Sequence, residues 1–267
     1  PNADSRKALV GNYEGTSSRY ITVLEGIEDY VGENVRVLYS EGCHLYRDRT
    51  SNLAMEHDRD SEVRAVCEAS DVVIAVVGLD ATLEGEEGDT GNEYGSGDKP
   101  NLNLPGLQPD IIRIAKESGK PVIVVLLAGS AMALSWEDEH VDAILDGFYP
   151  GAQGGAAIAE ILFGGANPEG KLPITFYQTT EELPEFTDYA MKGRTYRYME
   201  NEALYPFGYG LSYTTYAYGN LECVKPFDAQ DGITLQVTVT NTGDREGTET
   251  LQVYVKAKRE GTPNPQL

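Results

Sequence analysis

Two continuous apolar runs constrain the fold of this chain more than any other feature. The first covers residues 71–78, Asp-Val-Val-Ile-Ala-Val-Val-Gly, and the second covers residues 121–127, Pro-Val-Ile-Val-Val-Leu-Leu. Runs without polar alternation are typical of strands that are buried on both faces, as in parallel sheets covered by helices. Apolar residues at helical spacing over 107–118 predict a helix between them. We therefore expect the two strands to be parallel and to be neighbours or near-neighbours.

The remaining elements before residue 212 fit the same plan. Helical spacing predicts further helices at 22–31, 61–69 and 156–163. Shorter strands are expected at 35–39, 141–149 and 172–176. Together these elements predict an α/β fold with a mostly parallel sheet sandwiched by helices. The chain opens in a turn-like sequence without a preceding strand, so we expect this domain to lack its first strand.

The pattern changes near residue 212. Alternating strands without helices between them are expected at 219–225, 233–240 and 250–255. A β-sandwich of the immunoglobulin type needs about seven strands in about 100 residues. The sequence therefore predicts an α/β domain over 1–212 and an incomplete all-β domain over 213–267.

The net charge of the chain restricts the kinds of molecule that it can bind. The 267 residues include 43 acidic and 21 basic side chains, for a formal net charge of -22. Such a surface disfavours nucleic acid and anionic membranes as partners, and no apolar run is long enough to span a bilayer. A neutral ligand such as a sugar fits this composition better.

One loop, residues 80–105, concentrates the candidate functional residues. It follows the first apolar run, so it leaves from the carboxyl end of a central strand, where open α/β sheets bind ligands. It carries Glu84, Glu86, Glu87 and Asp89 among glycines. These carboxylates are consistent with a solvated acidic loop, and also with an acid catalyst, because crowding raises the pKa of at least one carboxyl. Glu84 and Glu86 would share one face of an extended segment while Glu87 points away, and the residues alone do not choose among them.

Other reactive residues lack the arrangement that their chemistry requires. Ser130 has no nucleophile-elbow glycine and no convincing histidine partner, and residues 165–171 match phosphate-loop spacing in the wrong structural context. The three cysteines and three histidines are widely scattered, so they predict neither a disulfide framework nor a metal site.

Several short stretches occur along the chain in a specific order and spacing. They include Pro1-Asn-Ala-Asp-Ser5, Val76-Val-Gly-Leu-Asp80, Leu83-Glu-Gly-Glu-Glu87, Leu104-Pro-Gly-Leu-Gln108, Gly170-Lys-Leu-Pro-Ile-Thr-Phe176 and Tyr205-Pro-Phe-Gly-Tyr-Gly-Leu-Ser-Tyr213. Each stretch is weak by itself, but their order and spacing together are specific. In these stretches the chain resembles, over nearly its whole length, the second and third domains of glycoside hydrolase family 3, the β-glucosidases and β-xylosidases.

The resemblance implies that two domains of the parent chain each supply one of the two catalytic residues. An N-terminal barrel domain of the same parent chain, not contained in this sequence, would supply an aspartate nucleophile. The α/β domain would supply the general acid/base, which the family's loop pattern places on Glu86, with Glu84 and Glu87 as alternatives. The all-β part would be the start of a fibronectin type III-like domain.

The implied reaction is hydrolysis of terminal β-D-xylosyl or β-D-glucosyl residues from oligosaccharides or aryl and alkyl β-glycosides, with retention of configuration and without a metal or organic cofactor. The alternative from a different class is a non-catalytic carbohydrate-binding or scaffold module.

Overall fold

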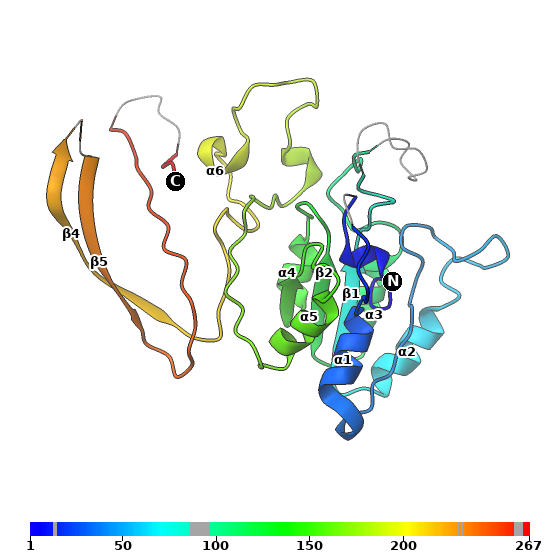
Figure 1. Ribbon diagram of the computed structural model, residues 1–267. Coiled ribbons are helices and arrows are strands. Elements are labelled where there is room, and N and C mark those ends of the chain that lie inside the picture. The colour runs from blue at the N-terminus through cyan, green and yellow to red at the C-terminus, as the bar shows by residue number, and fades with distance from the viewer. Residues whose placement is uncertain (13–14, 86–96, 229, 231, 259–263) are drawn as a thin grey trace.

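The computed structural model describes residues 1–12, 15–85, 97–228, 230, 232–258 and 264–267. Its first part is an α/β domain (Figure 1). The domain is built around a sheet of three strands in the order β1-β2-β3. These strands are β1 (Val73–Gly78), β2 (Val122–Leu127) and β3 (Ala143–Asp146). Both pairs are parallel, with Val73 opposite Val122 and Ile123 opposite Ala143. The α/β fold predicted from the two apolar runs is therefore confirmed.

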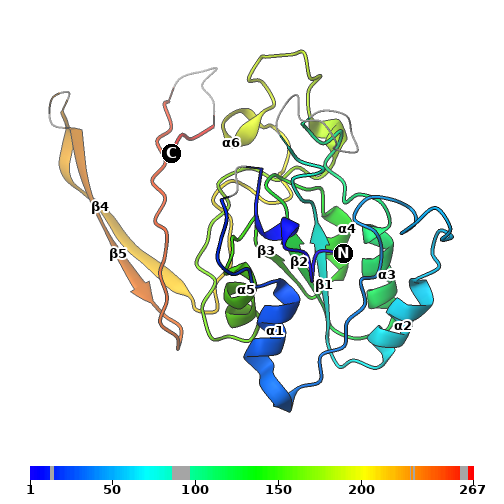
Figure 2. The same ribbon diagram turned by 45° about the vertical axis from the view of Figure 1, so that its right-hand side comes forward.

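Helices cover both faces of this sheet, as Figure 2 shows. On one face, α1 (Val23–Val31) and α5 (Gly154–Leu162) pack against β1 and β2 in a core with Val76, Val125 and Leu127. The other face is covered by α2 (Asp60–Glu68), α3 (Gln108–Glu117) and α4 (Ser135–His140). Because β2 lies between two parallel neighbours and two helical layers, Val124, Val125, Leu126 and Leu127 are fully buried.

Two local features explain how α1 is set against α5. The helix begins at a capping box in which the Thr22 hydroxyl accepts from the Glu25 N–H at 3.2 Å and the Glu25 carboxylate accepts from the Thr22 N–H at 2.9 Å. Glycines then allow the two helices to approach closely. A Cβ at Gly155 would lie 1.9 Å from the Thr22 carbonyl oxygen, so no larger residue fits there without moving the helix.

Three of the predicted strands are not formed, because their backbones have no partner strand or only a single bridge in the described chain. Residues 35–39 belong to no strand because no neighbouring strand lies beside them in the described chain. Residues 172–176 contribute only one antiparallel bridge, between Phe176 and Tyr205. Residues 250–255 likewise contribute one bridge, between Val255 and Gln266. An apolar, β-branched run becomes a strand only where backbone partners are present.

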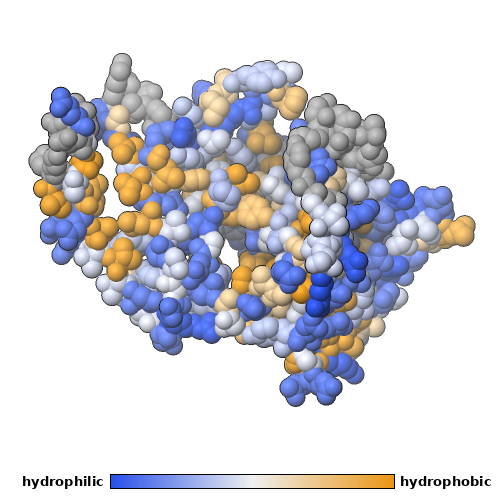
Figure 3. Space-filling view, in the orientation of Figure 1, coloured by the Kyte–Doolittle hydropathy of each residue, from blue (hydrophilic) through white to orange (hydrophobic). Residues whose placement is uncertain are grey.

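The second part is antiparallel. Strands β4 (Tyr216–Asp228) and β5 (Gly232–Asn241) form a two-stranded sheet with irregular register after Gly219. Large apolar side chains are exposed along them and along residues 251–255, where Figure 3 shows orange side chains gathered at the left. A sandwich domain covers such a face with a second sheet. The incomplete fibronectin type III-like domain over 213–267 stays a prediction.

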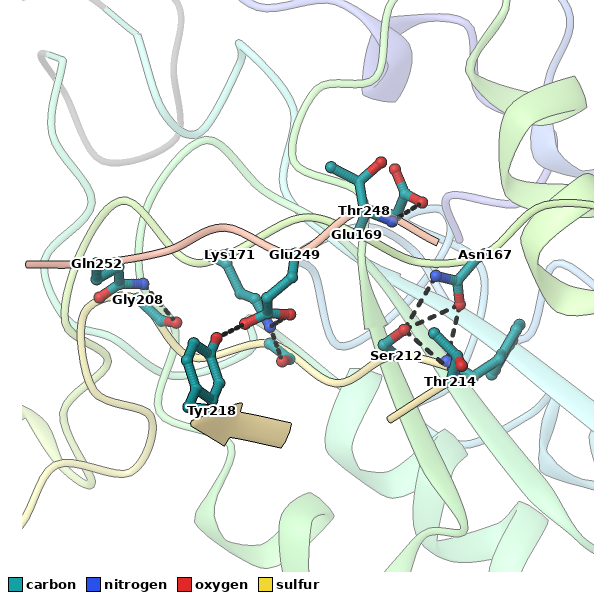
Figure 4. A network of polar contacts seen from close by, with 12 residues as sticks. Asn167, Glu169, Lys171, Gly208, Ser212, Thr214, Tyr218, Thr248, Glu249 and Gln252 are labelled. Atoms are coloured by element: carbon teal, nitrogen blue, oxygen red, sulfur yellow. Dashed lines mark hydrogen bonds and ion pairs between the residues drawn. The ribbon is translucent and has the colours of Figure 1, made fainter. Parts of the chain in front are cut away.

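A network of polar contacts joins the two parts (Figure 4). The Asn167 side chain donates to the Ser212 hydroxyl at 2.9 Å and accepts from the Tyr213 N–H at 2.8 Å. Nearby, the Glu169 carboxylate accepts from the Thr248 N–H at 2.7 Å, and Lys171 lies 3.8 Å from Glu249. These contacts fix the aromatic linker against the segment that precedes residue 172.

The remaining short elements are α6 (Thr195–Tyr198) and the 3-10 turns Lys7–Leu9, Gly32–Asn34 and Thr180–Glu182. Among the residues that the structure describes, no helix has the length and apolar character needed to cross a membrane.

Candidate functional site

The acidic loop leaves the sheet directly after β1, as predicted from the order of the elements. Asp80 is buried there, and its carboxylate accepts from the Thr82 N–H at 2.8 Å and from the Thr82 hydroxyl. The Asp80 carbonyl oxygen accepts from Leu83 at 3.0 Å and from Glu84 at 3.1 Å. Leu83 is fully buried in the core cluster of β1 and β2. This turn therefore fixes the backbone of Glu84 close to the ends of the strands.

Three donors converge on the Glu84 carboxylate. The Gly129 N–H donates at 2.8 Å, the Tyr149 hydroxyl donates at 2.7 Å, and the Ser130 hydroxyl donates to the other oxygen. Gly129 and Ser130 follow β2, and Tyr149 follows β3. Because the strands are parallel, their carboxyl ends meet at one edge, and Glu84 ties the three segments together. Ser130 was not expected to be a nucleophile, and its hydroxyl here donates a hydrogen bond to Glu84.

Tyr149 is held in the form that can donate. Burial raises the pKa of its hydroxyl, and the adjacent Glu84 carboxylate raises the pKa further. The phenol therefore stays protonated at neutral pH, and its proton is directed to Glu84. The contact is consequently a charge-assisted hydrogen bond, the stronger kind in proteins.

The two sides of the loop meet at its base. The Gly85 N–H donates to the Gly97 carbonyl oxygen at 2.9 Å. Two residues later, the Lys99 ammonium donates to the Ala131 carbonyl oxygen at 2.5 Å and lies 3.1 Å from the Met132 sulfur. Burial lowers the Lys99 pKa to about 8, and the Glu84 carboxylate opposes that shift. We call Glu84, Gly85, Gly97 and Lys99 the loop stem; both of its sides are bound to the segment after β2.

The loop returns to α3 through the Leu104-Pro-Gly-Leu-Gln108 stretch. Leu102 and Leu104 are buried, and Gln108 is fully buried at the start of α3. The Gln108 amide accepts from the Gly78 N–H at 2.7 Å and donates to the Gly78 carbonyl oxygen at 2.8 Å. It thus makes the hydrogen bonds that a neighbouring strand would make at the last residue of β1.

Asp146, at the end of β3, is a further buried carboxylate at this edge. Its Oδ1 accepts from the Phe148 N–H at 3.0 Å, whereas its Oδ2 is buried and has no hydrogen-bond partner within the described residues. Burial raises the Asp146 pKa to about 6. This carboxyl group therefore takes up a proton in weakly acidic solution.

The structure places only part of the predicted site. It describes Glu84, whereas Glu86, Glu87 and Asp89 lie outside the described residues. Over the described ranges, no group of three histidine, cysteine or acidic side chains could hold a metal ion. Cys43, Cys67 and Cys223 form no disulfide with one another, and Cys43 and Cys67 are buried.

Sequence reasoning missed Tyr149, Lys99 and Asp146. Tyr149 and Asp146 were open to prediction, because polar residues at the ends of parallel strands converge on one edge. No local signal marks Lys99, since its burial depends on the segment after β2.

The described geometry defines a class: a parallel α/β domain with a loop whose stem is held at the carboxyl ends of its strands, followed by antiparallel β-structure. The model for the glycosyl hydrolase family 3 C-terminal domain matches residues 1–213. The chain belongs to this family.

The relatives of this chain include proteins named as β-glucosidases and proteins named as β-xylosidases. The chain is 36% identical over 284 residues to a periplasmic beta-glucosidase of Salmonella typhimurium, covering 96% of this chain and 36% of that protein. It is 47% identical over 187 residues to a xylan 1,4-beta-xylosidase of Xylanibacter ruminicola, covering 69% of this chain and 21% of that protein. The chain thus spans about a third or less of these relatives.

Solved structures agree with the fold. A β-glucosidase of Erythrobacter marinus superposes with a TM-score of 0.80 at 31% identity, covering 96% of this chain and 36% of that one. A GH3 exo-β-xylosidase in complex with a xylobiose aziridine activity-based probe also gives a TM-score of 0.80, at 28% identity, covering 99% of this chain and 36% of that one.

Proposed function

We propose that this chain is part of a retaining β-glycosidase and supplies its general acid/base, Glu86. The parent enzyme releases terminal non-reducing β-D-xylosyl or β-D-glucosyl residues from oligosaccharides or from aryl and alkyl β-glycosides. The nucleophile is an aspartate of a barrel domain outside this sequence. Support comes from family membership and from relatives named as β-glucosidases and β-xylosidases.

The observation that carries the assignment of roles is the state of Glu84. Both of its oxygens already accept hydrogen bonds, from Gly129, Ser130 and Tyr149. A general acid must direct a proton to the leaving oxygen, so a carboxylate occupied by three protein donors is better suited to anchoring the loop. This favours the second glutamate of the Leu83-Glu-Gly-Glu-Glu87 stretch, in agreement with the family pattern.

The chemistry follows from two carboxyl groups on opposite sides of the glycosidic bond. The barrel aspartate attacks the anomeric carbon while Glu86 protonates the leaving oxygen. Glu86, now ionised, then removes a proton from the water that releases the sugar. No metal or organic cofactor takes part in these steps.

The test is a comparison of leaving groups in the parent enzyme. General acid catalysis contributes about 10² to 10⁴-fold, so Glu86→Ala should lower turnover of a disaccharide by about that factor. Turnover of a dinitrophenyl glycoside should fall far less in the first step, because its leaving group needs no proton. Azide should partly restore the rate by attacking the glycosyl-enzyme without a base.

Glu87→Ala is the matched control, since it removes a neighbouring carboxylate of the same loop. If Glu87→Ala or Glu84→Ala gives the leaving-group pattern and Glu86→Ala does not, the assignment to Glu86 is wrong. If none of the three does so, this loop does not supply the acid/base.

The chain alone should not turn over substrate, because retaining chemistry needs two carboxyl groups about 5 to 5.5 Å apart across the bond. An assay of the purified chain on aryl β-xyloside and aryl β-glucoside checks this point. Robust turnover that Glu86→Ala abolishes would place the nucleophile within these residues. A parent sequence without any barrel would instead favour a carbohydrate-binding or scaffold module.

A further inference from the structure

The segment that follows Leu183 exposes two aromatic side chains to solvent. Phe186 is 84% exposed and Tyr189 is 88% exposed, and among the large apolar side chains that the structure describes only Leu53 is more exposed. Met191, on the same segment, is also exposed. Single exposed apolar residues are normal on a protein surface, but a group of them close together is one sign of an interaction site. We call Phe186 and Tyr189 the aromatic pair.

The backbone that carries the aromatic pair is held in place by hydrogen bonds within the segment. The Asp188 N–H donates to the Glu185 carbonyl oxygen at 2.9 Å, which closes a turn around Phe186, and the Ala190 N–H donates to the Asp188 carboxylate at 2.8 Å. The Arg194 guanidinium donates to the Ala190 carbonyl oxygen at 3.0 Å and to the Asp188 carbonyl oxygen. A binding surface that is ordered in advance loses less conformational entropy when a ligand binds.

The end of the segment has a strained backbone. Thr195 has a φ of 54°, in the left-handed region that a β-branched residue rarely adopts. Its N–H donates to the Tyr177 hydroxyl at 3.0 Å, so the strained residue is bound to the start of the segment. Such strain persists only where the surrounding structure maintains it, and it is concentrated at binding and active sites.

The base of this segment lies against the loop that follows β1. The Thr180 hydroxyl accepts from the Leu102 N–H at 3.0 Å, and the Gln178 carbonyl oxygen accepts from the Ser135 hydroxyl at 2.8 Å. Leu102 is buried just beyond the loop stem, and Ser135 begins α4. Figures 1 and 2 show the segment before α6 standing above the sheet, on the side where the chain leaves β1. The aromatic pair is therefore carried at the carboxyl edge of the sheet, where such folds bind ligands.

The chemistry of the aromatic pair suits a sugar ring. A pyranose has faces of apolar C–H groups and a rim of hydroxyls, and the negative π surface of an aromatic ring can cover such a face. The Tyr189 hydroxyl and the exposed Glu185 carboxylate add hydrogen-bonding groups on the same segment. A sugar is uncharged, in keeping with the formal net charge of -22 of the chain.

We propose that Phe186 and Tyr189 stack against the sugar units on the leaving-group side of a β-linked oligosaccharide. This inference rests on the glycosidase function proposed above. The general acid of a glycosidase reaches the leaving oxygen, so side chains beside its loop face the leaving sugar rather than the terminal sugar that is released. The parent enzyme therefore binds an oligosaccharide better than a β-glycoside whose leaving group is a simple alcohol.

The experiment compares two kinds of substrate in the parent enzyme. Xylotetraose and cellotetraose carry sugar units on the leaving-group side, whereas the methyl β-glycosides of xylose and glucose do not. We expect Phe186→Ala and Tyr189→Ala each to raise the KM for the hydrolysed tetrasaccharide by about 2- to 12-fold, which is the range of one aromatic contact. The kcat, and both constants for the methyl glycoside, should stay unchanged, because the lost contact lies away from the reacting bond. Phe186→Tyr and Tyr189→Phe should keep the KM of the parent enzyme, since each retains a ring.

Leu53→Ala is the matched control, because Leu53 is an exposed apolar side chain of a different loop, and its KM should not change. The inference is overturned if both alanine variants of the aromatic pair leave the KM for the tetrasaccharide unchanged, or raise the KM for the methyl glycoside equally. It is also overturned if they lower only the melting temperature of the parent enzyme, because the aromatic pair then contacts another domain of that chain. A parent enzyme that hydrolyses neither kind of substrate would overturn the proposed function, and this inference with it.

Discussion

Glu84 should act as the anchor of the loop stem, and its contribution to stability can be isolated with Tyr149. In Glu84→Ala, the Gly129 N–H and the Ser130 hydroxyl can recover water because they lie near the surface, whereas the half-buried Tyr149 hydroxyl loses a charge-assisted bond of 2.7 Å. Hydrogen bonds to charged groups contribute about 1.5 to 3 kcal/mol. We therefore expect Glu84→Ala to lower the free energy of unfolding by about 2 kcal/mol.

The double-mutant cycle separates this contact from general damage. Tyr149→Phe alone should cost about 1 kcal/mol, and the combined variant should cost less than the sum, with a coupling energy of about 1 kcal/mol. The assay is denaturant unfolding followed by circular dichroism at pH 7, with the slope of the transition checked for constancy.

Glu139→Ala is the matched control, because Glu139 is exposed on α4; we expect a change within about 0.5 kcal/mol. A Glu84→Ala variant as stable as this control, or a coupling energy near zero, would refute the anchoring role. Glu84 would then be a free carboxylate at the strand ends and would return as a candidate for the acid/base.

Two further predictions concern the same edge of the sheet. Because burial raises the Asp146 pKa to about 6, the folded protein takes up a proton between about pH 4 and 6, and its stability should fall as the pH rises through that window. Asp146→Asn, which keeps an acceptor for the Phe148 N–H, should remove this pH dependence and raise the free energy of unfolding at pH 7 by up to about 3 kcal/mol. Urea titrations at pH 4 to 7 measure the pH dependence of stability. An unchanged pH profile in the variant would contradict the prediction. Gln108→Ala should lower the free energy of unfolding by about 2 to 4 kcal/mol, because it leaves the Gly78 N–H and C=O unpaired and buried. The control Gln178→Ala, at an exposed side chain, should lower it little. Equal shifts in melting temperature for the two variants would show that Gln108 does not complete β1.

The fold could be predicted because its central strands are specified locally. Residues 71–78 and 121–127 are apolar on both faces, which favours a covered parallel sheet, and β1 and β2 pair in that way. Residues 35–39 have a similar composition but form no strand. Their pairing depends on a neighbour that the described chain does not contain, and composition alone cannot reveal this.

The choice among the loop carboxylates could not be made locally. Glu84 and Glu86 are two residues apart and would share a face of an extended segment. What distinguishes Glu84 is contact with Gly129, Ser130 and Tyr149, which lie 45 to 65 residues further along the chain. Those contacts exist only because three parallel strands end at one edge. The periodicity of the sequence therefore predicted the carboxyl edge of the sheet and the loop that leaves it. Only the tertiary contacts identified Glu84 as the residue that anchors the loop stem.

A raised pKa does not by itself identify the proton donor of a glycosidase. Among the described carboxyl groups, burial raises the pKa of Asp146 to about 6 and also raises the pKa of Glu137 in α4. A raised pKa is what a general acid needs in order to keep its proton at higher pH. A general acid must also touch the leaving oxygen, and neither group can do so, because the Asp146 Oδ2 is closed off from solvent and the Glu137 side chain is buried. Glu84 lies at the strand ends, but its two oxygens accept hydrogen bonds from three donors, so we expect it to anchor the loop rather than to reach the leaving oxygen. The leaving-group comparison with Glu86→Ala tests whether a carboxyl group in the loop between Gly85 and Gly97 both holds a proton and reaches the leaving oxygen.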